Sequence, residues 1–302
     1  MRRLQMPALV ALFSIGCGDS TLAQEWQLDR LRVLAVRATP AEPQPGELVS
    51  FDSLLYVPPD TTLDGVTWFG CIPEGDIGFG CELDTSVLED FENIDPATAS
   101  PEELAELFTQ LQEAGFIGYE PGFDPMWQVP ADALDGFTDA EKQEGVNAIV
   151  NITAIPAGAE DDEVELALKR VPVSLADTPN HNPDVTGIDI SGAGFVGGTG
   201  TTADPYVLKA GGEMKLHPVI ADDAVEDYTY LTSTGETESR TEEPYYAWYT
   251  DGGEFEQNIS LPPYNYATYT APKESGWSGI VVVVMRDRRG GMGWKQVTVT
   301  VE

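Results

Sequence analysis

Gly279-Ile-Val-Val-Val-Val-Met285 and the residues after it decide the fold of this chain. The apolar run is followed by a polar, glycine-containing turn, Arg286-Asp-Arg-Arg-Gly-Gly291, and then by Lys295-Gln-Val-Thr-Val-Thr-Val301. The last stretch alternates apolar and polar residues, which places its three valines on one face of a strand. β-Branched runs on both sides of such a turn predict a β-hairpin at the end of the chain.

The residues before this hairpin predict further strands of the same domain, which we expect to span 184–302. Short runs of β-forming residues alternate there with turn residues. The predicted strands are Val185–Ile190, Tyr206–Ala210, Glu213–Ala221, Pro244–Tyr249 and Asn265–Thr270. Two connecting segments, 192–202 and 222–243, are glycine-rich or polar and are predicted to be loops.

A first β-domain is predicted for residues 26–175. Its predicted strands are Leu31–Val36, Leu48–Val57, Val66–Cys71, Val146–Ile155 and Val164–Val173. Trp68, on the third of these strands, is expected to point into the core. The segment 176–183 contains two prolines and shows no periodicity, so it is predicted to link the two domains.

Helical signals interrupt the first domain and predict an α-helical insertion at about 85–144. Ser100-Pro-Glu-Glu103 is a capping box with proline at the first helical position, which predicts a helix over 101–114. Thr138-Asp-Ala-Glu141 repeats the box before a shorter helix, which Gly145 should end. The residues between the two helices, 116–136, are rich in proline, glycine and aromatics and are predicted to form an ordered loop.

These patterns predict a mainly β protein with two β-sandwich domains, the first carrying an α-helical insertion. The first domain resembles an immunoglobulin-like sandwich, in which a tryptophan of an early central strand packs at the middle of the core. The final hairpin, with its Asp-x-x-Gly turn at Asp287–Gly290, looks like the last two strands of PKD-like and related immunoglobulin-like bacterial modules. The resemblance implies two immunoglobulin-like or PKD-like sandwiches in tandem.

The beginning of the chain has the layout of an export signal. Two arginines precede the apolar run Ala8-Leu-Val-Ala-Leu-Phe13, which is too short to span a membrane. The next residues, Ser14-Ile-Gly-Cys17, resemble the lipobox of bacterial lipoproteins, although its first position is usually leucine. The resemblance implies that 1–16 is a signal peptide and that Cys17 is lipidated and opens an acylated leader, 17–25. Ordinary secretion is the alternative.

Lipidation would decide where the mature protein is located. A lipid on Cys17 implies that the protein is held at a membrane through its N-terminus. Gly18 follows the cysteine where aspartate would be the retention signal. By analogy with lipoprotein sorting, this implies the outer membrane, with the protein facing either the periplasm or the cell surface.

Acidic residues dominate the charged residues of this chain. There are 51 aspartates and glutamates against 16 lysines and arginines, which gives a formal net charge of −35. Such a surface repels phosphate backbones, so nucleic acid is not an expected partner. It also repels anionic head-groups, so contact with a bilayer is expected through the lipid alone. Solubility explains this charge, and divalent cation binding is the alternative.

Four carboxylates of one predicted loop form a candidate calcium site. They are Asp222, Asp223, Glu226 and Asp227. Calcium binds through oxygen ligands, and β-sandwich modules carry such ligands in their loops. A solvated acidic loop is the alternative. The sequence predicts no other metal site and no other cofactor.

Cys71 and Cys81 remain as a pair once Cys17 is set aside. An even number of cysteines in an exported protein predicts a disulfide. Closing so short a loop would stabilise the fold by about 2.5 to 3 kcal/mol in the chain-entropy model. Zinc is the rival interpretation, but it needs four ligands, and His181 and His217 both belong to the other predicted domain.

Aromatic residues near the end of the chain are candidates for recognition. Tyr245, Tyr246 and Tyr249 lie on one predicted strand, and Trp294 shares a face of the last strand with polar residues. Alternation directs part of this set outward, where aromatic rings can stack on sugars or anchor a protein. These four residues are the candidate binding site for an envelope protein or a glycan. Core packing is the alternative, and it explains Trp248 better.

The sequence contains no catalytic signature. Gly192-Ala-Gly-Phe-Val-Gly197 has the spacing of a dinucleotide-binding turn, but the residues after it cannot begin the helix that this mechanism needs. No G-x-S-x-G motif is present, and acidic pairs are uninformative in so acidic a chain. We therefore expect a non-catalytic binding, adhesion or scaffolding protein. A polysaccharide-active enzyme, or an accessory domain of one, is the alternative.

Overall fold

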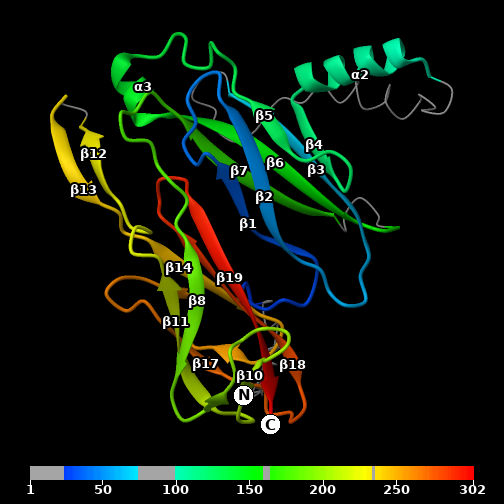
Figure 1. The fold of residues 1–302 in the computed structure, drawn as a ribbon, viewed down its shortest axis with the longest axis vertical. Helices are drawn as coiled ribbons and strands as arrows, with labels where there is room; N and C mark the ends of the chain where they lie inside the picture. The colour runs from blue at the N-terminus through cyan, green and yellow to red at the C-terminus, as the bar shows by residue number, and fades with distance from the viewer. Residues whose placement is uncertain (1–23, 74–98, 159–163, 233–234) are drawn as a thin grey trace, which may run out of the picture.

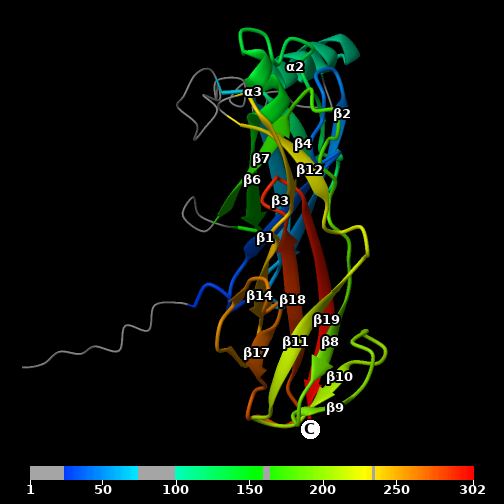
Figure 2. The same cartoon turned by 90° about the vertical axis from the view of Figure 1, so that its left-hand side faces the viewer.

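Two β-sandwiches, joined along the long axis of the molecule, make up the computed structural model, which describes residues 24–73, 99–158, 164–232 and 235–302 (Figures 1 and 2). Sandwich 1 covers 32–173. One of its sheets has the strand order β1 (Arg32–Thr39), β2 (Leu48–Tyr56) and β5 (Met126–Gln128). The other sheet has the order β4 (Phe116–Glu120), β3 (Leu63–Cys71), β6 (Val146–Pro156) and β7 (Glu165–Val173).

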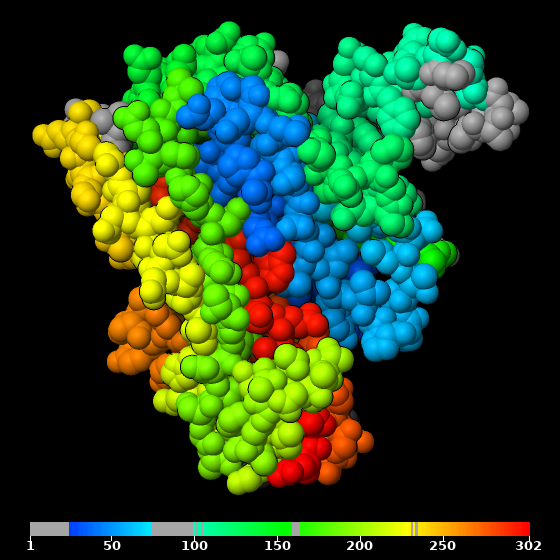
Figure 3. All heavy atoms as spheres, viewed as in Figure 1, coloured from blue at the N-terminus to red at the C-terminus, as the bar shows by residue number. Residues whose placement is uncertain are grey.

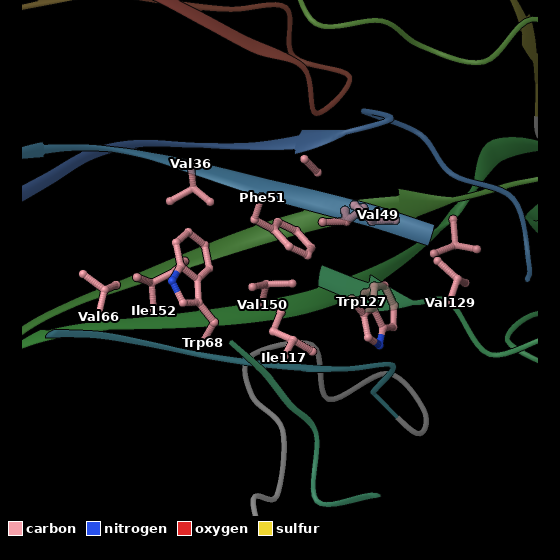
Figure 4. Packing of buried hydrophobic residues seen from close by; sticks show 14 of the residues in the cluster. Val36, Val49, Phe51, Val66, Trp68, Ile117, Trp127, Val129, Val150 and Ile152 are labelled. Atoms are coloured by element: carbon pink, nitrogen blue, oxygen red, sulfur yellow. The ribbon is translucent and has the colours of Figure 1, made fainter. Parts of the chain in front are cut away.

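The inward faces of these two sheets form the core of sandwich 1. Phe51 of β2 lies opposite Trp68 of β3 and Val150 of β6, and Val49 of β2 lies near Trp127 of β5, as Figure 4 shows. The rings of Phe51 and Trp68 lie 5.9 Å apart. Trp68 is fully buried, and its indole N–H donates a hydrogen bond of 3.1 Å to Glu120. The prediction that Trp68 points inward is confirmed, and its polar atom has the partner that burial requires.

Both predicted helices of sandwich 1 are present. They are α2 (Pro101–Glu113) and α3 (Asp139–Glu144), and each begins with a complete capping box. In each box the N-cap hydroxyl accepts the N–H of the third helical residue, whose glutamate accepts the N–H of the N-cap residue. Gly115 and Gly145 follow the helices with φ of +92° and +93°, a region in which glycine is favoured. The helix starts and ends were therefore readable from local signals.

The prediction of a loop over 116–136 is wrong in one respect, because this segment contributes one strand to each sheet of sandwich 1. β4 pairs with β3, and β5 pairs with β2. Trp127 of β5 and Leu134 are buried in the core of sandwich 1. Strands of five and three residues are too short for a clear alternation, and their stability depends on neighbours that are distant in the sequence.

Sandwich 2 covers 185–301 and contains the hairpin that was quoted first. One sheet has the order β16 (Ile259–Ser260), β14 (Tyr245–Thr250), β18 (Ser278–Arg286), β19 (Met292–Val301), β10 (Tyr206–Leu208) and β9 (Phe195–Gly197). The other has the order β15 (Glu254–Phe255), β17 (Ala267–Thr270), β11 (Glu213–Ile220) and β8 (Val185–Ser191). Val297, Val299 and Val301 all face the core, as predicted.

The strand order of both sandwiches is that of immunoglobulin-like domains. Sandwich 1 pairs its first, second and fifth strands in one sheet, and its fourth, third, sixth and seventh in the other. These are the A-B-E and C′-C-F-G sheets of such domains. In sandwich 2, β8, β11 and β17 correspond to A, B and E, and β14, β18 and β19 correspond to C, F and G. The predicted fold class, mainly β with two immunoglobulin-like sandwiches, is confirmed.

A two-stranded hairpin replaces the predicted loop 222–243. It consists of β12 (Asp227–Leu231) and β13 (Thr237–Thr241), and it extends from sandwich 2 towards α3 of sandwich 1 (Figure 1). The Arg240 guanidinium stacks on the Tyr230 ring at 3.8 Å. A hydrogen bond from Tyr230 to Glu144 of α3 raises the pKa of Tyr230. Polar strands of this kind lack the apolar alternation by which a strand is recognised in a sequence.

The first described residues pack on sandwich 2 before the chain enters sandwich 1. Leu28 N–H donates to the Thr250 carbonyl at 2.8 Å, and Thr250 N–H donates to the Trp26 carbonyl at 3.1 Å. The Trp26 ring stands edge-on to Phe255 of β15 at 5.7 Å. Residues 26–28, which we call the N-terminal strap, therefore tie the start of sandwich 1 to sandwich 2.

Several predictions concern residues outside the described ranges. The signal peptide, the lipidation of Cys17 and the second cysteine of the disulfide, Cys81, are among them, so they stay predictions. Cys71 is the last residue of β3. In the described part of the chain, no helix is both long and apolar enough to cross a membrane.

Candidate functional site

β18 is buried on both of its faces, one in the core of sandwich 2 and the other against sandwich 1. We take this contact between the two sandwiches as the candidate functional site. Val281, Val283 and Met285 point into the core of sandwich 2. Val282 and Val284 point the other way and are also fully buried. A strand that is covered on both faces has apolar residues at consecutive positions, which explains why β18 shows no alternation of apolar and polar residues.

Val282 and Val284 belong to a third hydrophobic cluster, which we call the joint core. Its buried members are Leu28, Leu34, Ala35, Val282 and Val284. Partly buried residues from both sandwiches pack against them, namely Leu54, Tyr56, Tyr249, Ile280, Met292 and Trp294. The joint core thus combines the strap, β1 and β2 of sandwich 1, and β14, β18 and β19 of sandwich 2.

A β-bulge in β1 supplies the sandwich 1 side of the joint core. The pairing of β1 with β2 shifts between Val33 and Ala35. A bulge re-aims side chains, and here Leu34 and Ala35 both join the joint core, while Val36 points into the core of sandwich 1. Arg286 of β18 donates a hydrogen bond of 2.9 Å to the Leu34 carbonyl. The irregularity is therefore held in place by sandwich 2.

A charged cluster lies next to the joint core, at the tip of the β18–β19 hairpin. Its centre is Arg289, whose side chain is 16 % exposed. The guanidinium contacts Glu242 at 3.1 Å, Glu42 at 3.3 Å and Glu226 at 3.5 Å. The central carbon of the guanidinium also lies 4.4 Å from the centre of the Tyr228 ring. Because Glu42 comes from sandwich 1 and the other residues from sandwich 2, this arginine links the two domains.

The segment predicted to be a linker, 176–183, is part of the same contact. Asn180 is buried, and its backbone N–H donates to Glu42 at 2.7 Å while its side chain donates to Asp287 at 2.9 Å. Asn182 donates to the Ala38 carbonyl and accepts the Met292 N–H, so it bridges the two sandwiches directly. The segment connects the domains through hydrogen bonds as well as through the chain.

Asp287 organises the turn that presents Arg289. One of its carboxylate oxygens accepts the backbone N–H groups of Arg289, Gly290 and Gly291 at 2.7 to 3.0 Å. A side chain at Gly291 would collide with Asp287 and with the His181 carbonyl, so glycine is required there. Burial raises the pKa of the Asp287 carboxyl. The Asp-x-x-Gly turn quoted from the sequence is therefore the tip of the interdomain contact.

Lys169 of β7 meets this turn from sandwich 1. Its ammonium group donates a hydrogen bond to the Gly290 carbonyl, and the residue is 2 % exposed. Burial lowers the pKa of Lys169 to about 8, while the negative charge of Asp287 opposes this shift and the positive charge of Arg286 adds to it. A buried ammonium group is costly, which gives the contact a dependence on pH.

Relative to Lys169→Met, the wild type is expected to gain stability as the pH rises from 7 towards 10. The folded pKa of about 8 lies below the ordinary 10.5, so the unfolded chain binds more protons in this window. The free energy of unfolding of the wild type therefore rises, by about 3 kcal/mol over the whole window, and this rise is absent in the variant. Urea unfolding of both proteins at several pH values measures the difference. A difference that does not change with pH would contradict the buried ammonium.

The structure places the four candidate aromatics in different surroundings. Tyr246 is 1 % exposed in the core of sandwich 2, so the prediction that it can contact a ligand is wrong. Tyr249 and Trp294 pack against the joint core, and the Arg37 guanidinium of sandwich 1 lies 4.6 Å from the Trp294 ring. Tyr245 is half-buried beside Arg286 and Arg288. The outward face of β19 thus does have a partner, which is sandwich 1 of the same chain.

Trp248, in contrast, is the core residue that the sequence indicated. It is fully buried, and its indole N–H donates to the Ser260 hydroxyl at 2.9 Å.

The four candidate calcium ligands are also separated by their contacts. Glu226 contacts Arg289 and accepts from the His181 ring at 2.8 Å. Asp227 accepts a hydrogen bond from Thr241 of β13. Asp222 and Asp223 are exposed at the start of the segment. Within the described ranges, no three aspartate, glutamate, histidine or cysteine side chains are placed to hold a metal ion.

Sequence reasoning missed the residues that hold the two sandwiches together. Glu42, Lys169 and Arg289 carry no motif, and each is buried by segments more than 100 residues away in the sequence. One signal was available in the sequence. An apolar strand without alternation, followed directly by four charged residues in Arg286-Asp-Arg-Arg289, indicates a strand that is covered on both faces beside a polar contact.

No protein-family model matches the chain, and no curated protein matches it. Solved structures with similarity include the fibronectin(III)-like modules of Clostridium thermocellum CbhA, at 10 % identity and a TM-score of 0.25 over 89 % of this chain and 94 % of that one. Murine CEACAM1b gives 8 % identity and a TM-score of 0.22 over 89 % and 100 % of the two chains.

The two tandem V-type regions of VCBP3, a v-region-containing chitin binding protein, give 12 % identity and a TM-score of 0.26 over 89 % of this chain and 99 % of that one. Scores this low carry no argument about function. The immunoglobulin-like fold of this chain follows from its own strand order.

Proposed function

We propose that this protein is a non-catalytic scaffolding or binding module of a bacterial cell envelope, held at the outer membrane by a lipid on Cys17. One observation carries the proposal, which is that buried apolar contacts in the joint core and ion pairs in the Arg289 cluster join the two sandwiches. A rigid pair of domains presents surfaces on both at a constant spacing. That property suits a scaffold or an adhesion module, whose partner would be an envelope protein or a glycan.

The titratable groups near the interdomain contact support a structural role. Arg289, Glu42, Glu242 and Asp287 bond to one another, to Asn180 or to backbone N–H groups of the hairpin tip. Catalysis needs such groups to face a space that a substrate can enter. Here they face each other across two domains, so their charge stabilises an arrangement of the protein itself.

Export and anchoring rest on the sequence of the first seventeen residues. The short apolar run and the glycine-cysteine pair support a lipid anchor, and Gly18 supports the outer membrane. An oxidising compartment would also allow the proposed disulfide between Cys71 and Cys81. The strong negative charge suits a protein that stays soluble while it is tethered.

Cys17→Ala is expected to move the protein from the membrane fraction to the soluble fraction. The acyl chains are its proposed attachment, and the variant cannot be acylated at that position. Cells that express each form are fractionated, and intact cells are treated with protease to find the side of the membrane. Cleavage in intact cells would place the protein on the surface, whereas protection would place it in the periplasm. If wild type and variant fractionate alike, the proposed anchor is wrong.

A further inference from the structure

The N-terminal strap and the short strand β16 lie along the same edge of β14. β18 occupies the other edge of β14 throughout. On the open edge, Gln27 of the strap bridges to Thr250, and Ile259 of β16 pairs with Ala247. Three residues of a strand separate these contact points, which is about 10 Å. Figure 2 shows the start of the described chain, in blue, and the orange segment that follows β14 on the same side of sandwich 2.

β16 and the residues after it, which together we call the edge loop (259–266), expose large apolar side chains. Ile259 is 42 % exposed, Leu261 is 46 % exposed and Tyr264 is 70 % exposed. The loop is closed by a bridge between Leu261 and Tyr264. In Figure 3 the orange atoms of this region project from the left side of sandwich 2. The loop is therefore a protrusion with an apolar tip.

The edge loop is also free of charge in a strongly acidic protein. Residues 257–272 contain no aspartate, glutamate, lysine or arginine, whereas the whole chain carries a formal charge of −35. An uncharged, apolar protrusion avoids the repulsion that the rest of this surface has for anionic head-groups. Isoleucine, leucine and tyrosine are residues that partition into the interfacial region of a bilayer.

Chain length brings this loop close to the proposed lipid. Six residues lie between Cys17 and Gln24, the first described residue, and the fully extended chain from one to the other spans about 25 Å. The strap then holds sandwich 2 by its hydrogen bonds to Thr250. The side of sandwich 2 that carries both strap and edge loop is thus kept near the membrane surface.

We propose that the edge loop contacts the lipid bilayer, with Ile259, Leu261 and Tyr264 entering its interfacial region. The proposal rests on the lipid anchor of the proposed function and names the surface that this anchor turns towards the membrane. It also differs from the expectation drawn from net charge, that the lipid alone touches the bilayer. Because the joint core connects the two sandwiches, it would then also set the orientation of sandwich 1 relative to the membrane.

A glycan fits this loop less well than a bilayer does. Sugar recognition uses an open aromatic face beside free polar groups. Tyr266 is already contacted by the Lys215 ammonium at 4.2 Å and by the His217 ring at 5.4 Å, and Tyr264 meets it edge-on at 6.4 Å. The side chains left exposed at the tip are apolar, and they form a protrusion.

Quenching of tryptophan fluorescence by brominated lipids tests the contact. Tyr264→Trp places a reporter at the tip of the edge loop, and Phe123→Trp places a matched reporter at a 51 % exposed site on sandwich 1. Acylated protein is reconstituted into phosphatidylcholine vesicles with and without brominated acyl chains. The fluorescence added by Tyr264→Trp is expected to fall at least about twofold in brominated vesicles, while that added by Phe123→Trp stays unchanged.

Two results would overturn the proposal, namely equal quenching of the two reporters or no quenching of the one in the edge loop. Flotation of the same vesicles tests the anchor separately. If the protein does not float, the proposed anchor fails, and the loop is measured with the chain from Gly18 onward, tethered by an N-terminal histidine tag to nickel-chelating lipid. If the reporter is not quenched and Tyr264→Ala weakens retention on a polysaccharide column, the loop binds a glycan, which also overturns the proposal.

Discussion

Arg289→Met is expected to lower the free energy of unfolding by about 3 to 5 kcal/mol at pH 7. The variant roughly keeps the length of the side chain but removes the positive charge that Glu42 and Glu242 share. Both glutamates are 6 % exposed as residues, and removing one partner of a buried ion pair leaves the other as an unpaired buried charge. Urea unfolding at 25 °C measures the loss.

The loss of unfolding free energy in Arg289→Met should be smaller at acidic pH than at pH 7. Burial already raises the pKa of Glu242 in the wild type, and the Arg289 guanidinium opposes that shift. Without the guanidinium, the folded variant binds protons at a higher pH than the unfolded chain does, so its stability recovers relative to the wild type as the pH falls from 7 towards 5. Measurements at both pH values report this change.

Arg288→Met is the matched control for this experiment. Arg288 is adjacent in the sequence, its side chain is 50 % exposed, and its ion pair with Glu243 is a loose 3.9 Å. Exposed pairs of this kind contribute about 0 to 1 kcal/mol. If Arg288→Met and Arg289→Met destabilise the protein equally, the Arg289 cluster does not hold the sandwiches together.

Val284→Asp is expected to separate the two sandwiches, at a cost of about 4 kcal/mol or more to the stability of the assembled form. Val284 is fully buried in the joint core, so a carboxylate there is taken out of water among apolar side chains. Opening the joint core would expose the new charge to water while leaving Val283 in the core of sandwich 2. Calorimetry should therefore show two transitions in the variant where the wild type shows one.

Val196→Asp controls for the addition of a negative charge to a strand of sandwich 2. Val196 lies on the edge strand β9 and is 47 % exposed. Substitutions at such positions change stability by about 0.5 kcal/mol or less. A single transition for Val284→Asp, at an unchanged temperature, would show that the joint core is not a real contact.

Local signals in the sequence were sufficient for much of the fold. The capping boxes at Ser100 and Thr138 fix two helix starts, because their hydrogen bonds involve residues only three positions apart. The β18–β19 hairpin was readable because its valines alternate against the polar residues of β19. Trp68 was correctly placed inside for the same reason. Each of these features depends on neighbours in the sequence or on period-two burial.

The elements that the sequence did not predict depend on distant partners. β4 and β5 are short, and each is held by a strand of sandwich 1 that precedes it by 45 residues or more. The hairpin of β12 and β13 has few apolar residues, and it contacts α3 of the other sandwich. No local pattern encodes such contacts, because the stabilising residues belong to another segment.

The candidate site shows the same limit. An aromatic residue on a polar face, Trp294, indicates a binding partner. The sequence does not show that this partner is Arg37 and the outer face of sandwich 1. The unbroken apolar sequence of β18 contained the missing information. A strand of an antiparallel sheet with one solvated face alternates, so the absence of alternation indicated a second buried face.

The central claim, that the two sandwiches move as one rigid body, is tested most directly by residual dipolar couplings. Backbone N–H couplings are measured in a dilute alignment medium, and an alignment tensor is fitted separately for 32–173 and 185–301. If the two sandwiches are rigidly joined, one tensor is expected, equal in magnitude and orientation for both. Two tensors of different magnitude would show independent motion and would contradict the joint core as a fixed contact.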